Sequence, residues 1–310
     1  MRALVTGGAG FIGSHMVDRL VAGGREVRVI DNLSSGEQRL PFLDAAGVEV
    51  ERLDIRDQAC TRLIEDFRPD EIYHFAAQMD VRRSVADPIY DADVNVLGTL
   101  RILGAAAKVR ARVVTASSGG CIYGEADPDR FPLDERTPRN PGSPYGITKS
   151  VMDDYLRFYR ENNGLQYANL ALGNVYGPRQ DPAGEAGVVA IFGLRLLKGE
   201  PCAIFADGSQ TRDYIYVSDV VEAFFAAWSK GDGERFNIGT GIETSVNDLY
   251  ARLAAICGVD AEPKYKPARP GELNRSCLSS AKAGEILGWC PQKDLDEGLA
   301  ETVEFLRTQL

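Results

Sequence analysis

The stretch Val5–Val17, "VTGGAGFIGSHMV", joins a short apolar run to three spaced glycines and an amphipathic segment. Gly7, Gly10 and Gly13 have the spacing G-x-x-G-x-x-G between a predicted strand and a predicted helix. Glycine permits a tight turn and lets the backbone approach a pyrophosphate, while the helix N-terminus presents free amides and a positive dipole end. The stretch predicts the phosphate-binding turn of a dinucleotide site, although a turn without a ligand would use the same glycines.

The next predicted strand, "EVRVID", ends at Asp31, about twenty residues after the glycines. A carboxylate there accepts hydrogen bonds from a ribose 2′-hydroxyl and repels a 2′-phosphate, which favours NAD over NADP. In "LDIRD", Asp54 and Ile55 follow a third predicted strand, where they are expected to contact the edge of the adenine. These residues extend the predicted dinucleotide site beyond the glycine turn.

Short apolar runs alternate with amphipathic segments along the N-terminal half, which is typical of a parallel sheet covered by helices on both faces. We therefore predict an α/β fold with a Rossmann-type doubly wound sheet in residues 1–172, and a smaller C-terminal substrate-binding lobe in 173–310. Part of 213–240 is expected to join the first domain. The predicted strands are 2–7, 26–31, 71–77, 112–118 and 167–173, and a helix is predicted over 12–23.

Composition excludes several classes of partner. The 310 residues carry a formal net charge of −10, which argues against nucleic acid or an anionic membrane, because phosphates are held mainly by Lys and Arg. Six cysteines without a C-x-x-C pair, and two histidines, predict free thiols in a reducing compartment and no metal site. No apolar run approaches the length of a membrane span, so we expect a cytoplasmic protein.

The segment "SPYGITKS" places Tyr145 and Lys149 four residues apart, on one face of a predicted helix. A phenol with a pKa near ~10 is a poor base, but a neighbouring ammonium and a cationic nicotinamide favour its phenolate. Tyr145 is then able to accept and return a hydroxyl proton. A surface pair with no catalytic role would have the same spacing, so the dinucleotide turn upstream is what favours catalysis.

With these motifs the chain resembles the extended short-chain dehydrogenases/reductases, most closely the UDP-glucose 4-epimerase group of nucleotide-sugar-modifying enzymes. The matching motifs run through nearly the whole chain: "GGAGFIG", "DNLSSG", "LDIRD", "HFAAQMDVRRSVADP", "NVLGTLRIL", "YGITK", "NVYGPRQ", "RDYIYVSD", "FNIGTG" and "RPGE". The resemblance implies a tightly held NAD and reversible hydride transfer through a 4-keto sugar. Tyr145 would take the proton from the sugar 4-hydroxyl, and the keto sugar would turn before hydride returns.

The resemblance also implies the site residues. Cofactor contacts are implied for Gly7, Gly10, Phe11, Ile12, Gly13, Asp31, Asn32, Ser34, Gly36, Asp54, Ile55, Phe75, Ala76, Ala77, Gln78, Asn95, Tyr145 and Lys149. Nucleotide-sugar contacts are implied for Gln78, Ser118, Gly119, Tyr145, Asn174, Val188, Val189, Ala203, Phe205, Arg212, Arg269 and Glu272. Arg212 and Arg269 suit a diphosphate, and Glu272 suits a ribose hydroxyl.

Related 4,6-dehydratases carry an Asp-Glu pair where this chain has Gly120 and Cys121, so dehydration is disfavoured. Uronate 4-epimerases commonly continue "GPRQ" with an arginine, whereas Asp181 follows here. A neutral hexose is preferred, and UDP-glucuronate remains open through Arg82, Arg83 or Arg179. The small Ser276, beside the sugar 2-position in relatives, suggests that N-acetylhexosamines also fit. The uridine base rests on the resemblance alone, and a non-catalytic NAD-binding regulator remains the non-enzyme alternative.

The motif "SSGGCIYG" departs from most relatives, which carry a catalytic Ser or Thr four residues before the tyrosine of "YG". That position is Gly119 here. We predict that Ser118 supplies the compensating hydroxyl. Ser117 is the second choice, and an ordered water is the alternative. The predicted catalytic residues are therefore Tyr145, Lys149 and Ser118.

A homodimer is implied by the resemblance, through helices near 90–107 and 144–163. Apolar residues recur there at helical spacing, which core packing would equally explain. They are Val94, Leu97, Ile102, Met152, Leu156 and Tyr159.

Overall fold

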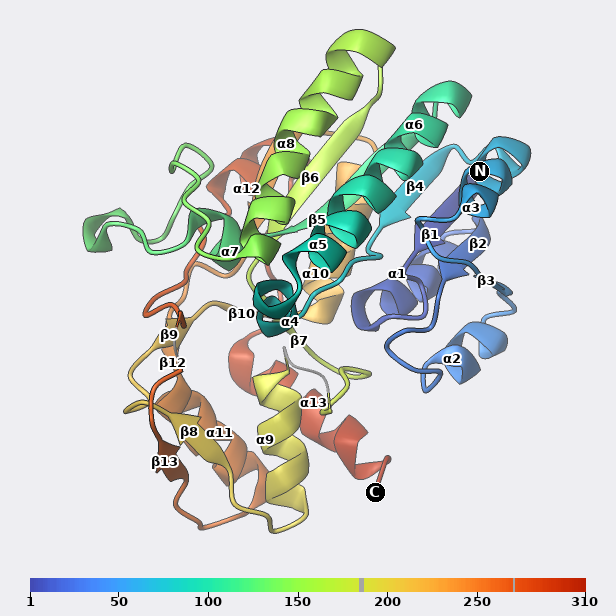
Figure 1. Cartoon of the computed structure of the whole chain (residues 1–310). Coiled ribbons are helices and arrows are strands. Elements are labelled where there is room, and N and C mark those ends of the chain that lie inside the picture. The colour runs from blue at the N-terminus through green and yellow to red at the C-terminus, as the bar shows by residue number, and fades with distance from the viewer. Residues whose placement is uncertain (184–186, 270) are drawn as a thin grey trace.

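The computed structural model describes residues 1–183, 187–269 and 271–310. Seven strands form one parallel sheet in the order β3, β2, β1, β4, β5, β6, β11 (Figure 1). Their bounds are β1 Arg2–Thr6, β2 Glu26–Asp31, β3 Val50–Arg52, β4 Glu71–His74, β5 Arg112–Ser118, β6 Tyr167–Leu172 and β11 Glu234–Ile238. This strand order confirms the predicted doubly wound fold.

Neighbouring residues of each strand point to opposite faces of the sheet, and both faces are apolar. Val5 and Val29 pack into one core, while Leu4 and Ile30 of the same two strands pack into the other. Period-two side-chain geometry produces this division. Because both faces are buried, the strands appear in the sequence as continuous apolar runs.

Helices cover both faces of the sheet (Figure 1). On one face α1 (Phe11–Ala22) packs beside α10 (Val217–Ala227), and α12 (Ala281–Leu287) packs against α10 and β11. On the other face α3 (Gln58–Phe67), α6 (Thr99–Val109) and α8 (Pro144–Asn163) lie side by side. The shorter helices are α2 Leu40–Ala45, α4 Val81–Ala86, α5 Pro88–Ala92, α7 Gly119–Tyr123, the π-helix η1 Asp93–Gly98 and the 3₁₀-helix η2 Pro128–Arg130.

The lower part of the molecule in Figure 1 has a core of its own, formed where α9 (Val188–Leu197), α11 (Val246–Cys257) and α13 (Leu295–Arg307) pack together. Three pairs of short strands complete it: β7 Asn174–Tyr176 with β10 Tyr214–Tyr216, β8 Ala203–Phe205 with β13 Lys264–Lys266, and β9 Thr211–Arg212 with β12 Thr244–Ser245. Between these elements the chain returns to the large sheet as α10 and β11.

The connections that leave the carboxyl ends of the sheet strands face the second core. In an open parallel sheet, ligands bind at this edge, where the chain order of neighbouring strands reverses. That reversal lies between β1 and β4. Within the described residues, no helix combines the length and apolarity needed to cross a membrane.

Candidate active site

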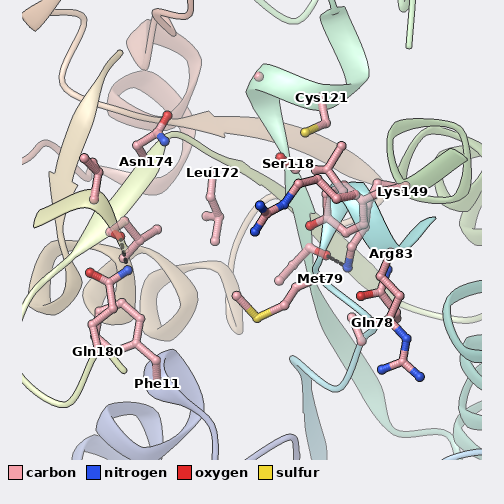
Figure 2. A pocket seen from close by; sticks show the side chains of 18 of the residues that line it. Phe11, Gln78, Met79, Arg83, Ser118, Cys121, Lys149, Leu172, Asn174 and Gln180 are labelled. Atoms are coloured by element: carbon pink, nitrogen blue, oxygen red, sulfur yellow. Dashed lines mark hydrogen bonds between the residues drawn. The ribbon is translucent and has the colours of Figure 1, made fainter. Parts of the chain in front are cut away.

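A cavity of about 1350 Å³ lies at the carboxyl edge of the sheet and extends to the second core. Cavities for a single small ligand usually measure about 300–1,000 Å³, so this one has space for a dinucleotide and a second molecule. Figure 2 shows Lys149, Ser118 and Cys121 on one side of the cavity and Phe11, Gln180 and Asn174 on another. Residues far apart in the sequence therefore share one cavity.

The glycine turn forms one wall of the cavity and leaves no room for side chains. Gly7 has a positive φ of 72°, and a Cβ there would lie 2.6 Å from the backbone nitrogen of Ala76. A Cβ on Gly13 would lie 2.1 Å from the carbonyl oxygen of Gly7. Gly10 caps α1 without any side-chain hydrogen bond, so the first-turn amides are not covered by a side chain. This geometry fits a bound pyrophosphate.

Asp31 lies at the end of β2 and lines the cavity. Its carboxylate accepts hydrogen bonds from the backbone amides of Ala9, at 2.9 Å, and Leu33, at 2.8 Å. Burial raises the pKa of Asp31 above its ordinary value, and the two amide hydrogen bonds oppose that rise. A carboxylate has about four acceptor sites, so two remain for ribose hydroxyls. Asp31 thus suits NAD, as the sequence predicts.

Asp54 follows β3 and also lines the cavity. It accepts a hydrogen bond of 2.9 Å from the Asn32 side chain, which ties two predicted cofactor residues together. Hydrogen bonds from Arg56 lower the pKa of Asp54 to about 2, so it is charged at neutral pH.

Sixteen of the predicted cofactor positions line the cavity, and Gly36 and Asn95 do not. Gly36 has a φ of 96° and serves the turn after Asp31. Asn95 is buried and contacts the lining residue Gln78 instead of the cavity. Its side chain accepts a hydrogen bond from the Gln78 backbone amide at 2.8 Å and donates one to the Gln78 carbonyl at 2.9 Å. The prediction of direct contact at these two positions has no support in the lining. The sixteen are Gly7, Gly10, Phe11, Ile12, Gly13, Asp31, Asn32, Ser34, Asp54, Ile55, Phe75, Ala76, Ala77, Gln78, Tyr145 and Lys149.

Tyr145 and Lys149 lie on the first turns of α8 and face the cavity. The helix starts at Pro144, because the Ser143 hydroxyl accepts from the Gly146 amide at 3.1 Å and so caps the N-terminus. The ammonium of Lys149 donates to the Ala116 carbonyl at 3.0 Å and lies 5.8 Å from the centre of the Tyr145 ring. The expected i, i+4 geometry is therefore present.

The pKa values of Tyr145 and Lys149 are governed mainly by burial, which the sequence does not show. Burial raises the pKa of Tyr145, with further rises from Cys121 and Asp91, and a Ser118 hydrogen bond opposes them. Burial lowers the pKa of Lys149 to about 8, against the effects of Asp91 and Cys121. Burial therefore favours the phenol form of Tyr145 at neutral pH and brings the pKa of Lys149 closer to neutrality.

Ser118, the last residue of β5, lines the cavity and its hydroxyl is hydrogen-bonded to the Tyr145 phenol. The same hydroxyl contacts the Cys121 thiol, whose pKa is raised by burial. Gly119 is buried and does not line the cavity, so its predicted sugar contact has no support. The reason is Leu278, which fills the space beside it. Ser117 lines the cavity and contacts the Lys149 carbonyl at 3.4 Å.

The predicted nucleotide-sugar residues gather at the far end of the cavity. Arg212 faces Glu272, with nitrogen and oxygen 3.6 Å apart, and the Arg269 guanidinium lies 3.6 Å from the centre of the Phe205 ring. These four residues line the cavity together with Asn174, Val188 and Ala203. Val189 does not, because its side chain points into the core of the second lobe. In "RPGE", Pro270 lies outside the described residues.

Several residues that line the cavity are absent from the sequence-based prediction. Met79 is 55% exposed at the cavity, and Gln180 and Lys266 also line it. Cys121 was considered only as a replaced dehydratase residue, yet it lies beside Ser118. Its position within "SSGGCIYG" is the one signal that pointed to it. Within the described residues, no group of three or more His, Cys, Asp and Glu is placed to hold a metal ion.

Comparison with known proteins places this arrangement in a family. Residues 3–239 match the model of the NAD dependent epimerase/dehydratase family. A UDP-glucose 4-epimerase of Mycolicibacterium smegmatis is 50% identical over 314 aligned residues, which cover 100% of this chain and 99% of that protein.

Among the solved structures that match over the whole chain are two UDP-glucose 4-epimerases. One is a UDP-glucose 4-epimerase from Thermotoga maritima with UDP-glucose, at 48% identity and a TM-score of 0.96, covering 100% of this chain and 99% of the other. The second is a UDP-glucose 4-epimerase from Thermus thermophilus in complex with NAD, at 42% identity and a TM-score of 0.92, covering 100% of both chains. This chain therefore belongs to the NAD-dependent epimerase/dehydratase family.

Proposed function

We propose that this protein catalyses NAD-dependent 4-epimerisation of a nucleotide sugar, with UDP-glucose and UDP-galactose as the substrate pair. The observation that carries the proposal is one shared cavity. Its glycine turn suits a dinucleotide, Tyr145 with Ser118 and Lys149 forms an acid–base group, and Arg212 with Arg269 supplies positive charge beyond it. The similar proteins named above are UDP-glucose 4-epimerases, which supports the same substrate.

In this proposal Tyr145 moves the proton of the sugar 4-hydroxyl. Its raised pKa keeps the phenol protonated until a positive charge or a hydrogen bond stabilises the phenolate. Ser118 supplies such a hydrogen bond, and Lys149 supplies positive charge below its pKa of about 8. Ser118 therefore takes the place of the hydroxyl that relatives carry at the position of Gly119.

NAD supplies the hydride acceptor and donor at the sugar C4 when it is bound. The protein would hold it through the glycine turn, through Asp31, whose two remaining acceptor sites suit ribose hydroxyls, and through the Asn32–Asp54 pair, which lines the cavity. The volume of about 1350 Å³ leaves room for a sugar to turn between two orientations.

Arg212 and Arg269 would bind the diphosphate. Their guanidinium groups contact Glu272 and Phe205, so a diphosphate would compete with an ion pair and with a cation–π contact. Glu272, released from Arg212, is then free to accept from a ribose hydroxyl.

The test is incubation of the purified protein with UDP-galactose and no added cofactor, followed by NMR of the proton at C4. Formation of UDP-glucose supports the proposal, and Tyr145→Phe is the matched inactive control. Absence of conversion, with NAD demonstrably bound, would favour a non-catalytic NAD-binding regulator.

UDP-glucuronate is the second candidate substrate, because a carboxylate needs a cation. Of the three arginines considered from the sequence, Arg82 and Arg83 line the cavity and Arg179 does not. Arg179 pairs with Asp18 at 2.7 Å and lies over the Phe42 ring. The same NMR assay with UDP-glucuronate separates this candidate from the first.

We also propose a homodimer, formed by an exposed apolar face on α4, α5, η1 and α8. Its residues are Val85, Ile89, Leu97, Ile147 and Phe158. Four of the positions named from the sequence, Val94, Ile102, Met152 and Leu156, are buried in the subunit. An apolar face of this kind on a folded domain commonly marks a protein interface.

The proposal includes two domains, an NAD-binding domain of residues 1–172 with α10 and β11, and a nucleotide-sugar lobe made mainly of 173–310. The separate cores support this division, and α12 of the C-terminal part packs into the core of the first domain. A cytoplasmic location is proposed with it, supported by six free cysteines.

A further inference from the structure

Asp91 on α5 is a fully buried acid that lies next to the proposed active site and does not line the cavity. One carboxylate oxygen accepts from the Gln78 side chain at 2.8 Å and from the Asn95 side chain at 3.1 Å. The other accepts from the Thr148 hydroxyl at 2.9 Å. All three partners act as donors, which fits the ionised form of the acid.

These hydrogen bonds join three elements that carry site residues. Gln78 belongs to the loop after β4 and lines the cavity, and its backbone is also held by Asn95 of η1. Thr148 lies between Tyr145 and Lys149 on α8, and its hydroxyl also contacts the Tyr145 carbonyl at 3.0 Å. The carboxylate therefore sets the position of Gln78 relative to the catalytic helix.

Asp91 also acts on Lys149 through its charge. Among the described side chains, neither Asp91 nor Lys149 forms an ion pair within 4 Å. The titratable groups coupled to Lys149 are Tyr145 on its own helix, Asp91 from α5, Cys121 from α7 and His74 from β4. Burial raises the pKa values of the Cys121 thiol and the Tyr145 phenol and lowers that of His74 to about 3, so these three groups are neutral at pH 7.

Other charged side chains near α5 are engaged elsewhere. Arg83 lies 4.1 Å from the centre of the Tyr90 ring, and Asp93 is paired with Arg56 at 2.8 Å. Arg82 lines the cavity. The buried negative charge that offsets the ammonium of Lys149 therefore comes from Asp91.

We propose that Asp91 is a positioning residue of this active site: it fixes Gln78 and Asn95 against the catalytic helix and supplies the buried negative charge that keeps Lys149 cationic. The catalytic consequence rests on the proposed function, because it assumes that charged Lys149 supports Tyr145. The effect on Lys149 itself does not depend on that assumption.

The test compares Asp91→Asn with Asp219→Asn. Asn keeps the size of the side chain and one acceptor, and the Thr148 hydroxyl is able to accept from the new amide. Asp219 is a matched control, because it is a buried carboxylate that accepts from the backbone amides of Gln292 and Lys293 and does not line the cavity.

The direct readout is NMR titration of ¹³C-labelled lysine side chains, with Lys149 assigned by the signal missing in Lys149→Met. We expect a midpoint near 8 in the wild type and in Asp219→Asn. In Asp91→Asn the midpoint should fall, because the buried opposite charge that raises it is lost. The alkaline limb of the kcat profile should move in the same direction.

Equal Lys149 midpoints in the wild type and Asp91→Asn would overturn the proposal. If the titration shifts but wild-type protein turns over no nucleotide sugar, the proposed function fails while the role of Asp91 toward Lys149 stands. Thr148→Val tests the positional part alone, with an unchanged titration and a lower kcat expected. Should Asp91→Asn fail to fold, Asp91→Ser removes the same charge with less steric demand and gives the same readout.

Discussion

Leu278 occupies the space that a side chain at position 119 would need. A Cβ built on Gly119 lies 2.4 Å from Cδ1 of Leu278 and 2.8 Å from its Cδ2, and Leu278 is fully buried. A side chain at position 119 would therefore force the buried Leu278 side chain to shift. This contact joins residues 159 positions apart, so the motif around Gly119 alone does not reveal it.

Restoring the hydroxyl of most relatives with Gly119→Ser should lower the free energy of unfolding by about 1–3 kcal/mol, because it overpacks the site beside Leu278. It should not raise kcat. Urea unfolding measures the loss, and Gly104→Ser is the control, since a Cβ there meets only the Tyr159 hydroxyl at 3.5 Å. Combining Gly119→Ser with Leu278→Ala should cost less than the two single losses added. Strict additivity would contradict the contact.

Ser118→Ala should lower kcat by about 2–10-fold, the value of one hydrogen bond to the Tyr145 oxygen. Tyr145→Phe removes the acid–base group and should lower kcat by about 10²–10⁴-fold. Single-turnover kinetics with UDP-galactose compares them, and Ser117→Ala, whose hydroxyl contacts the Lys149 carbonyl, should stay close to wild type. A wild-type rate for Ser118→Ala would assign the hydrogen bond to water or to the backbone.

Sequence patterns that span only a few residues predict the glycine turn, the relation of Tyr145 to Lys149 and the strands of the sheet. The G-x-x-G-x-x-G spacing and Asp31 predicted the glycine turn, because Gly7 needs its positive φ and Gly13 needs close contact with that turn. The i, i+4 spacing predicted that Tyr145 and Lys149 face the same cavity. Apolar runs predicted the sheet because both its faces are buried.

Contacts between segments that are far apart in the sequence could not be predicted from such short patterns. Asn95 was expected at the cofactor, yet it holds Gln78 from behind, and Val189 points into a core. The sequence predicts that Lys149 and a cationic nicotinamide favour the phenolate of Tyr145, whereas burial in the structure raises the pKa of the phenol. Each of these depends on burial, which a single sequence does not specify residue by residue.

The enzyme should epimerise UDP-N-acetylglucosamine in addition to UDP-glucose, because Ser276, which lines the cavity, is small. Its hydroxyl would lie 2.9 Å from a Cβ at Gly120, so the two small residues adjoin. Ser276→Tyr should lower kcat/KM for the N-acetylated sugar at least about tenfold more than for UDP-glucose, by filling the space of the acetamide. No turnover of the N-acetylated sugar by the wild type, under conditions where UDP-glucose reacts, would remove this prediction.

Acid should destabilise the protein through its two histidines. His74 is buried between the hydroxyls of Thr6, at 2.6 Å, and Thr99, at 2.9 Å, and burial lowers its pKa to about 3. Below the unfolded pKa near ~6.5 the unfolded chain gains a proton that folded His74 does not bind. The contribution to stability is therefore complete above pH 6.5 and falls by up to about 1.4 kcal/mol per pH unit on acidification toward 3.

Urea unfolding between pH 3.5 and 7.5 measures this slope. His74→Gln, which keeps partners for both threonines, should flatten the curve below pH 6.5. His15→Gln is the comparison, because burial lowers the pKa of His15 to about 4 and its effect should end near that pH. Parallel curves for the wild type and His74→Gln would show that the imidazole is not the source.

The exposed apolar face should hold two subunits together. Ile89 is 81% exposed and Phe158 52% exposed, on α5 and α8, which pack against each other (Figure 1). Ile89→Asp places a charge where desolvation is costly, so it should convert a dimer of about twice 33.8 kDa into a monomer, as measured by light scattering. Ile242→Asp is the control, because Ile242 is 66% exposed in the loop after β11, away from this face. A wild-type protein of 33.8 kDa, or monomers from both variants, would contradict the assignment of this face as the interface.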